Sequence, residues 1–259
     1  MQVGYACLTI GVAHTDYRKV LMKNATHDNL RAIISYNLQS LKNVILYNIA
    51  NDIKLFRISS DLIPFGSSPV NPLFWWEDYA SELAEIGRLI QDAKMRVSFH
   101  PGQYTVINSP HQEVVDRAIA DLEYHAQILD SLGVDDSHKI VLHIGGVYLD
   151  KPKAMQQFVS QFQKLSTRVQ RRLIIENDDK SYHIEDVLTI HDLTGIPVVY
   201  DNLHNQVHPS PTKASDAQWI EKCAKTWKNR DGRQKIHYSQ QAANKRPGSH
   251  STTIFVDSF

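Results

Sequence analysis

Five residues of metal-binding type each stand at the end of a short run predicted to be a β-strand, or directly after it. They are His100, His143, Glu176, Asp201 and His237. The spacings between successive members are 43, 33, 25 and 36 residues, each about the length of one β/α unit. His204 follows Asp201 by three residues and adds a sixth candidate. Imidazole and carboxylate side chains bind divalent cations, so this pattern predicts a metal site built from several strand ends.

A single polar residue after a strand often caps the next helix or bonds to a loop carbonyl. Five at the same position in successive units are harder to explain in that way. Packed together without a cation, carboxylates and imidazoles would have to change protonation state to avoid uncompensated charge. A bound divalent ion removes that conflict, and we therefore interpret the set as metal ligands.

The types of ligand restrict the metal. A mixture of His, Asp and Glu without cysteine suits Mn²⁺, Zn²⁺, Fe²⁺ or Co²⁺, and is too rich in nitrogen for Ca²⁺ or Mg²⁺. Glu176 and Asp201, on adjacent predicted strands, could bridge two ions roughly 3.5–4 Å apart, the spacing used in two-metal phosphodiester cleavage.

The elements that must position these residues alternate along the chain. Strands are predicted at residues 3–5, 54–58, 96–99, 139–143, 172–176, 197–201 and 234–237. Helices are predicted from apolar residues at three- and four-residue spacing at 29–49, 77–93, 114–132, 153–169, 184–193 and 215–227. Such alternation indicates a parallel sheet and an α/β fold. A length of 259 residues suits a single TIM-type (β/α) barrel domain over residues 1–259, with its eighth β/α unit lacking or truncated.

The composition is that of an ordinary globular protein. The apolar fraction is 42%, the formal net charge is zero, and the two cysteines argue against a disulfide framework. No apolar run reaches membrane-spanning length and no signal-peptide pattern is present, so we expect a cytoplasmic protein. One segment is locally basic, with a single acid, Asp231, among Lys228, Arg230, Arg233, Lys235, Lys245 and Arg246. It is either a solvated loop or a phosphate-binding face.

Several short strings resemble those of one known family. RISS at 57–60, SFHPGQY at 98–104, HIGG at 143–146, ENDDK at 176–180 and KIH at 235–237 occur in this order, together with Asp201 and His204. In order and spacing they resemble the UV damage endonucleases over nearly the whole chain, from Tyr5 to about His250.

That resemblance implies a TIM barrel related to endonuclease IV and the xylose isomerases. It implies incision of DNA on the 5′ side of pyrimidine dimers, other photoproducts and abasic sites, with two or three Mn²⁺ ions, or Zn²⁺ or Co²⁺ in their place. By matching position, the metal ligands would be His100, His143, Glu176, Asp201, His204, His237 and His250. Glu176, His143 and Lys235 would be the catalytic residues, and Lys235 the lysine that some members carry in carboxylated form.

The resemblance also implies double-stranded DNA containing UV lesions as the partner of a monomer associated with the nucleoid. Gln103 and Tyr104 would be a wedge that fills the gap when damaged bases leave the stack. Tyr5 would hold the displaced nucleotides, and Arg57 and Lys180 would contact phosphates. The sequence departs from the family at Ser68, where a histidine ligand is usual, and at Thr9, where some members have asparagine. It also ends before the eighth strand, which supplies a glutamate ligand in the family.

Two other functions remain open on the sequence. A sugar isomerase or epimerase on the same barrel would also have a two-metal His/carboxylate site, but it predicts a closed pocket for a small molecule. A catalytically weak, damage-binding remnant would retain well under one ion per chain after dialysis.

Overall fold

The computed structural model describes residues 2–258. The chain divides into two compact units. Unit 1 comprises Met1–Thr105 and Asp116–Ile140, and unit 2 comprises Val106–Val115 and Val141–Phe259. Strand β4, Lys139–His143, begins in unit 1 and ends in unit 2.

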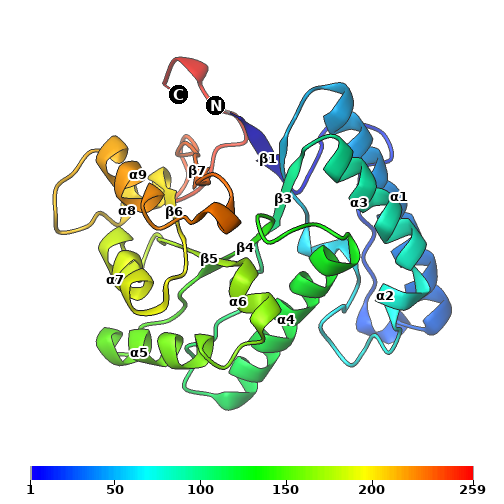
Figure 1. Ribbon diagram of the computed structural model, residues 1–259, viewed down its shortest axis with the longest axis horizontal. Coiled ribbons are helices and arrows are strands. Elements are labelled where there is room, and N and C mark those ends of the chain that lie inside the picture. The colour runs from blue at the N-terminus through cyan, green and yellow to red at the C-terminus, as the bar shows by residue number, and fades with distance from the viewer. Residues whose placement is uncertain (1, 259) are drawn as a thin grey trace. The chain divides into compact units, whose positions relative to one another are not determined.

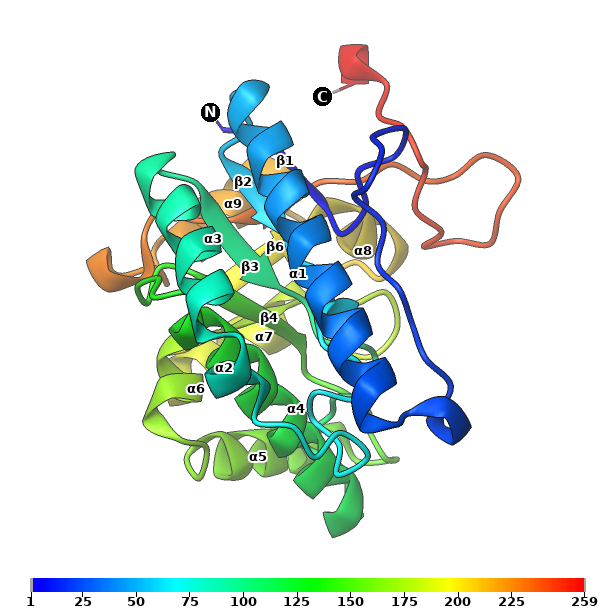
Figure 2. The same cartoon turned by 90° about the vertical axis from the view of Figure 1, so that its right-hand side faces the viewer.

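Unit 1 is built on three short parallel strands and the start of β4. The strands are β1 (Gly4–Ala6), β2 (Leu55–Arg57) and β3 (Arg96–Phe99). Its helices are α1 (His27–Ala50), α2 (Trp75–Asp78), α3 (Ala80–Asp92) and most of α4 (Gln112–Ser131), with the 3₁₀ turns η1 (Met22–Asn24) and η2 (Ser60–Leu62). Helix α1 packs alongside α3 (Figure 2). Phe99 pairs with Ile140, which joins β3 to β4.

Unit 2 continues the same alternation. Its strands are the end of β4, β5 (Leu173–Glu176), β6 (Val198–Asp201) and β7 (Ile236–His237). Its helices are α5 (Lys151–Phe162), α6 (Thr167–Arg172), α7 (Ile184–Thr194), α8 (Asn202–Val207) and α9 (Asp216–Ala224), with the 3₁₀ turns η3 (Asn229–Asp231) and η4 (Val256–Ser258). Helix α9 packs against β6 (Figure 1).

The strand order follows the chain, from β1 to β7. The pairs β1–β2, β2–β3, β3–β4, β5–β6 and β6–β7 are parallel. This order confirms the expected α/β fold of TIM-barrel type, with seven strands among residues 2–258. The middle residues Val141, Ile174 and Val199 of β4 to β6 are fully buried as one apolar cluster, as expected for a parallel sheet covered by helices.

Local signals explain where several elements begin and end. The Thr26 side chain accepts a hydrogen bond from the Asn29 amide and caps α1. His183 caps α7 in the same way, and that helix ends at Gly195, whose φ of 73° is in the left-handed region. Helix α5 begins after Asp150, with a proline in its first turn.

The structure corrects three predicted elements. The helix predicted at 153–169 is two helices, α5 and α6, because Ser166 caps a new start with its side chain accepting from the Val169 amide. The helix predicted at 77–93 is likewise split, into α2 and α3. Strand β7 has two residues in place of the four predicted at 234–237. Among the described residues, no helix is both long and apolar enough to cross a membrane.

Candidate metal centre

The predicted ligands of unit 2 lie at the carboxyl ends of neighbouring parallel strands. His143, Glu176, Asp201 and His237 are the last residues of β4, β5, β6 and β7. Asp201 pairs directly with His237 in the β6–β7 register. Because parallel neighbours end at the same edge of a sheet, four residues separated by up to 94 positions in the chain lie at one edge.

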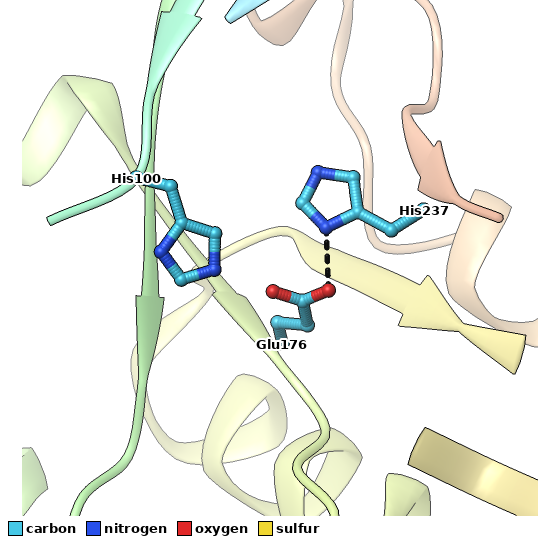
Figure 3. A group of neighbouring side chains, drawn as sticks. All are labelled: His100, Glu176 and His237. Atoms are coloured by element: carbon cyan, nitrogen blue, oxygen red, sulfur yellow. Dashed lines mark hydrogen bonds and ion pairs between the residues drawn. The ribbon is translucent and has the colours of Figure 1, made fainter. Parts of the chain in front are cut away.

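Glu176 lies between two imidazoles and is almost completely buried, with 1% of its surface exposed. Its Oε1 is 2.5 Å from Nδ1 of His237 (Figure 3). Its Oε2 is 3.6 Å from Nε2 of His143. A buried carboxylate with an imidazole near each oxygen is a suitable centre for a divalent cation.

Asp201 and His204 join the cluster from the start of α8. The Asp201 Oδ1 accepts a hydrogen bond from the His204 amide at 2.9 Å and so caps this helix. Ligand atoms of Glu176, Asp201 and His204 all lie within 4.8 Å of one another. The His204 ring lies 5.4 Å from that of His143 and 5.7 Å from that of His250, measured between centroids. The capping role of Asp201 is therefore compatible with its predicted role as a metal ligand.

Burial and charge place these groups in conflict. Burial, and then the negative charge of Glu176, raise the pKa of Asp201 to about 7. Burial lowers the pKa of His204, but the charges of Asp201 and Glu176 outweigh burial, and the net shift is upward. Two carboxylates that compete for protons in a buried place are the arrangement that a divalent cation stabilises, so the residues present fit a metal ion.

One asparagine, Asn177, holds two of the predicted ligands in place through its side chain and its backbone carbonyl, a feature that the sequence analysis did not predict. The Asn177 side chain is fully buried; it accepts from the Asp201 amide at 2.9 Å and donates to the Asp201 carbonyl at 3.0 Å. The Asn177 carbonyl lies 2.8 Å from Nδ1 of His204. Because a carbonyl only accepts, in the neutral His204 ring Nδ1 carries the hydrogen and Nε2 keeps the lone pair that a metal requires. The only sequence signal for Asn177 is its place in the ENDDK string.

The remaining residues that the sequence analysis singled out differ in their surroundings. His250 is exposed and belongs to an isolated antiparallel bridge with Gln241. Lys235 is half-buried and directly precedes β7. His100 belongs to unit 1, where it directly follows β3; its carbonyl lies 3.4 Å from the Ser60 hydroxyl. Ser68, at the position of an expected histidine, uses its hydroxyl to accept from the Val70 amide.

The residues predicted to contact DNA differ in exposure. Tyr104 is 82% exposed, and Gln103 and Lys180 are exposed as well. Arg57 is half-buried, and its Nε is inaccessible to solvent. The Tyr5 hydroxyl is engaged, because it donates to Asn48 Oδ1 at 2.7 Å and lies 2.7 Å from the Thr9 hydroxyl.

Comparison with known proteins identifies the family. The family described as UV-endonuclease UvdE matches residues 1–258. This chain belongs to the UvdE family. A UV DNA damage endonuclease of Clostridium perfringens (strain 13 / Type A) is 44% identical to it over 260 residues. That match covers 100% of this chain and 63% of the Clostridium protein, so the chain spans less than two thirds of that relative.

Solved structures agree with the UvdE assignment. The crystal structure of SacUVDE matches with a TM-score of 0.94 and 36% identity, covering 100% of this chain and 87% of that one. A D-psicose 3-epimerase matches with a TM-score of 0.53 and 12% identity, covering 79% of this chain and 71% of the epimerase. At that identity the epimerase shows a shared fold only.

Proposed function

We propose that this UvdE-family protein is a metal-dependent DNA repair endonuclease that incises the backbone 5′ to UV photoproducts and other distorting lesions. The observation that carries the proposal is the buried Glu176, with His143 and His237 at its two oxygens and Asp201 and His204 beside it. This donor set stands in a chain that is similar to named UV DNA damage endonucleases.

The ions would be held by His143, Glu176, Asp201, His204 and His237, with His250 and, at the end of β3, His100 as further ligands. The lack of sulfur among these donors and their mixture of nitrogen and oxygen favour Mn²⁺, with Zn²⁺ or Co²⁺ as substitutes. When bound, such ions lower the pKa of a water molecule and stabilise negative charge on the phosphate.

The residues of the chain would prepare this chemistry in definite ways. Glu176 would orient the two imidazoles that flank it, and the bond of His204 Nδ1 to the Asn177 carbonyl keeps its Nε2 available. Lys235, directly before β7, would place a cationic or carboxylated side chain near the reacting phosphate.

The contacts with DNA would come from loops and exposed side chains. Tyr104, with four fifths of its surface exposed, has the aromatic face that base stacking needs, and Gln103 lies next to it. Lys180 and Arg57 would contact phosphates, and Tyr5 the displaced nucleotides. We propose a monomer that acts on double-stranded DNA in the cytoplasm.

The test is nicking of UV-irradiated supercoiled plasmid, with unirradiated plasmid as the substrate control and Mn²⁺ or EDTA in parallel. Nicking of irradiated DNA alone, and only with Mn²⁺, is the expected result. Mapping the ends on an oligonucleotide with one photoproduct then determines the side of incision. Equal nicking of both plasmids would contradict lesion specificity, and no nicking with any divalent ion would contradict the enzymatic function.

A further inference from the structure

We propose that Asn108 and Tyr182 act as positioning residues for His143, by clamping the carbonyl of Gly146. This inference rests on the proposed function, because it concerns the metal site on which that function depends. Asn108, Gly146 and Tyr182 are called the Gly146 clamp below.

The Gly146 clamp is a closed triangle of hydrogen bonds. The Tyr182 hydroxyl donates to the Gly146 carbonyl at 2.8 Å. The Asn108 Nδ2 donates to the same carbonyl at 2.8 Å and to the Tyr182 hydroxyl at 3.3 Å. Tyr182 is fully buried and Asn108 is 1% exposed, so these bonds are shielded from competition with water.

The backbone between His143 and the clamp has little freedom to move. Gly145 has a φ of 114°, a conformation that residues with a Cβ rarely adopt. A Cβ built on Gly145 would lie 2.3 Å from Asn108 Oδ1, so the Asn108 side chain packs directly on this turn. Ile144 is fully buried. Only Ile144 and Gly145 lie between His143 and Gly146, so fixing Gly146 restricts the direction in which β4 ends.

The clamp also ties the His143 turn to the loop that follows Glu176. The Asp178 amide donates to the Tyr182 carbonyl at 2.9 Å, and the Tyr182 amide donates to the Asp178 carboxylate at 3.2 Å. Tyr182 is thus anchored to a residue only two positions after Glu176, while its hydroxyl holds a residue three positions after His143. The turn after His143 and the loop after Glu176 are thus held together by hydrogen bonds that involve neither side chain. This connection supports the 3.6 Å separation between His143 Nε2 and Glu176 Oε2.

A second tyrosine offers a matched control. The Tyr79 hydroxyl donates to the Arg31 carbonyl at 2.9 Å and accepts from the Ser35 hydroxyl at 3.4 Å. It is 7% exposed and is the N-cap of α3, and it belongs to unit 1, whereas the Gly146 clamp belongs to unit 2. Tyr182→Phe and Tyr79→Phe each delete one hydroxyl that bonds to a backbone carbonyl and receives one side-chain donor. Both should cost similar stability, but only the first should affect the metal site.

The experiment compares the parent with Tyr182→Phe and Tyr79→Phe in three measurements. Mn²⁺ affinity is measured from free Mn²⁺ by electron paramagnetic resonance, and incision of irradiated DNA gives kcat and KM. Hydrogen exchange by mass spectrometry reports on the peptide covering residues 143–149. In Tyr182→Phe we expect Mn²⁺ affinity to fall about tenfold, kcat to fall more than KM changes, and exchange in 143–149 to rise about tenfold. In Tyr79→Phe all three should stay within about twofold of the parent. Asn108→Ala should shift all three measurements in the same direction as Tyr182→Phe. It therefore tests the clamp even if Tyr182→Phe fails to fold.

The outcomes separate the clamp from the proposed function. Unchanged exchange in 143–149 in both clamp variants would overturn the clamp. Faster exchange with parental Mn²⁺ affinity would overturn the positioning role, while incision by the parent would leave the proposed function intact. If the parent itself neither binds Mn²⁺ nor incises, the proposed function fails and the positioning role fails with it.

Discussion

Asp201→Asn is predicted to stabilise the metal-free protein at neutral and alkaline pH while it abolishes metal binding. Asp201 is 2% exposed, and burial followed by the charge of Glu176 raises its pKa to about 7. A carboxyl group whose folded pKa is raised binds its proton more tightly in the folded state. The parent therefore loses stability as the pH rises from the unfolded pKa through the folded pKa, and asparagine does not titrate.

The size of the effect follows from the pH window. Between pH 5 and the folded pKa of about 7 lie about two pH units, at about 1.4 kcal/mol per unit. Relative to Asp201→Asn, the parent should lose at most about 3 kcal/mol of unfolding free energy from pH 5 to pH 8. In the parent the His204 amide donates to Asp201 Oδ1, and the side-chain oxygen of asparagine can accept the same hydrogen bond. The cap of α8 is therefore retained in the variant.

The assay is urea unfolding of both proteins in EDTA at pH 5 and pH 8. We expect the variant to be the more stable at pH 8, with a smaller difference at pH 5. Addition of Mn²⁺ should then raise the stability of the parent and leave the variant unchanged, because only the parent retains the full ligand set. A variant that is less stable than the parent at pH 8 in EDTA would refute the argument that Asp201 is destabilised by burial beside Glu176.

Three other substitutions test separate parts of the site. Glu176→Gln keeps the size of the side chain but removes the charge between His143 and His237. Mn²⁺ affinity should fall more than about a hundredfold and incision should be lost. The circular dichroism spectrum should stay unchanged, because the fold is retained. Parental incision by this variant would exclude Glu176 as a ligand. Tyr104→Ala should reduce the preference for irradiated over intact DNA about tenfold in a binding assay without altering metal content; equal preference would contradict the wedge. Gly145→Ala should destabilise the fold by about 1–3 kcal/mol in urea unfolding, since φ is 114° and Asn108 occupies the space; a neutral effect would show that the turn can relax.

The sequence by itself determined the α/β alternation and predicted which residues of unit 2 come together at one edge of the sheet. Apolar runs at β3 to β6 and three- to four-residue periodicity in the helices are local signals that survive folding. Parallel strands end at one edge, so the spacing of His143, Glu176, Asp201 and His237 was sufficient to predict that they meet. His204 was predicted from its position three residues after Asp201, and in the structure this separation is the first turn of α8, which Asp201 caps.

Only the tertiary structure showed how those candidate ligands are held. The Asn108–Tyr182 bond joins residues 74 positions apart, and the bonds of Asn177 to Asp201 cross from one strand end to the next. No periodicity marks such residues, because asparagine and tyrosine in a loop are equally compatible with a solvated turn. The short helix α8 was missed for a related reason. Its six residues give too few turns for a periodic pattern, and it forms because Asp201 caps it. Local chemistry therefore determines which residues can bind a metal, and long-range packing determines their orientation and protonation.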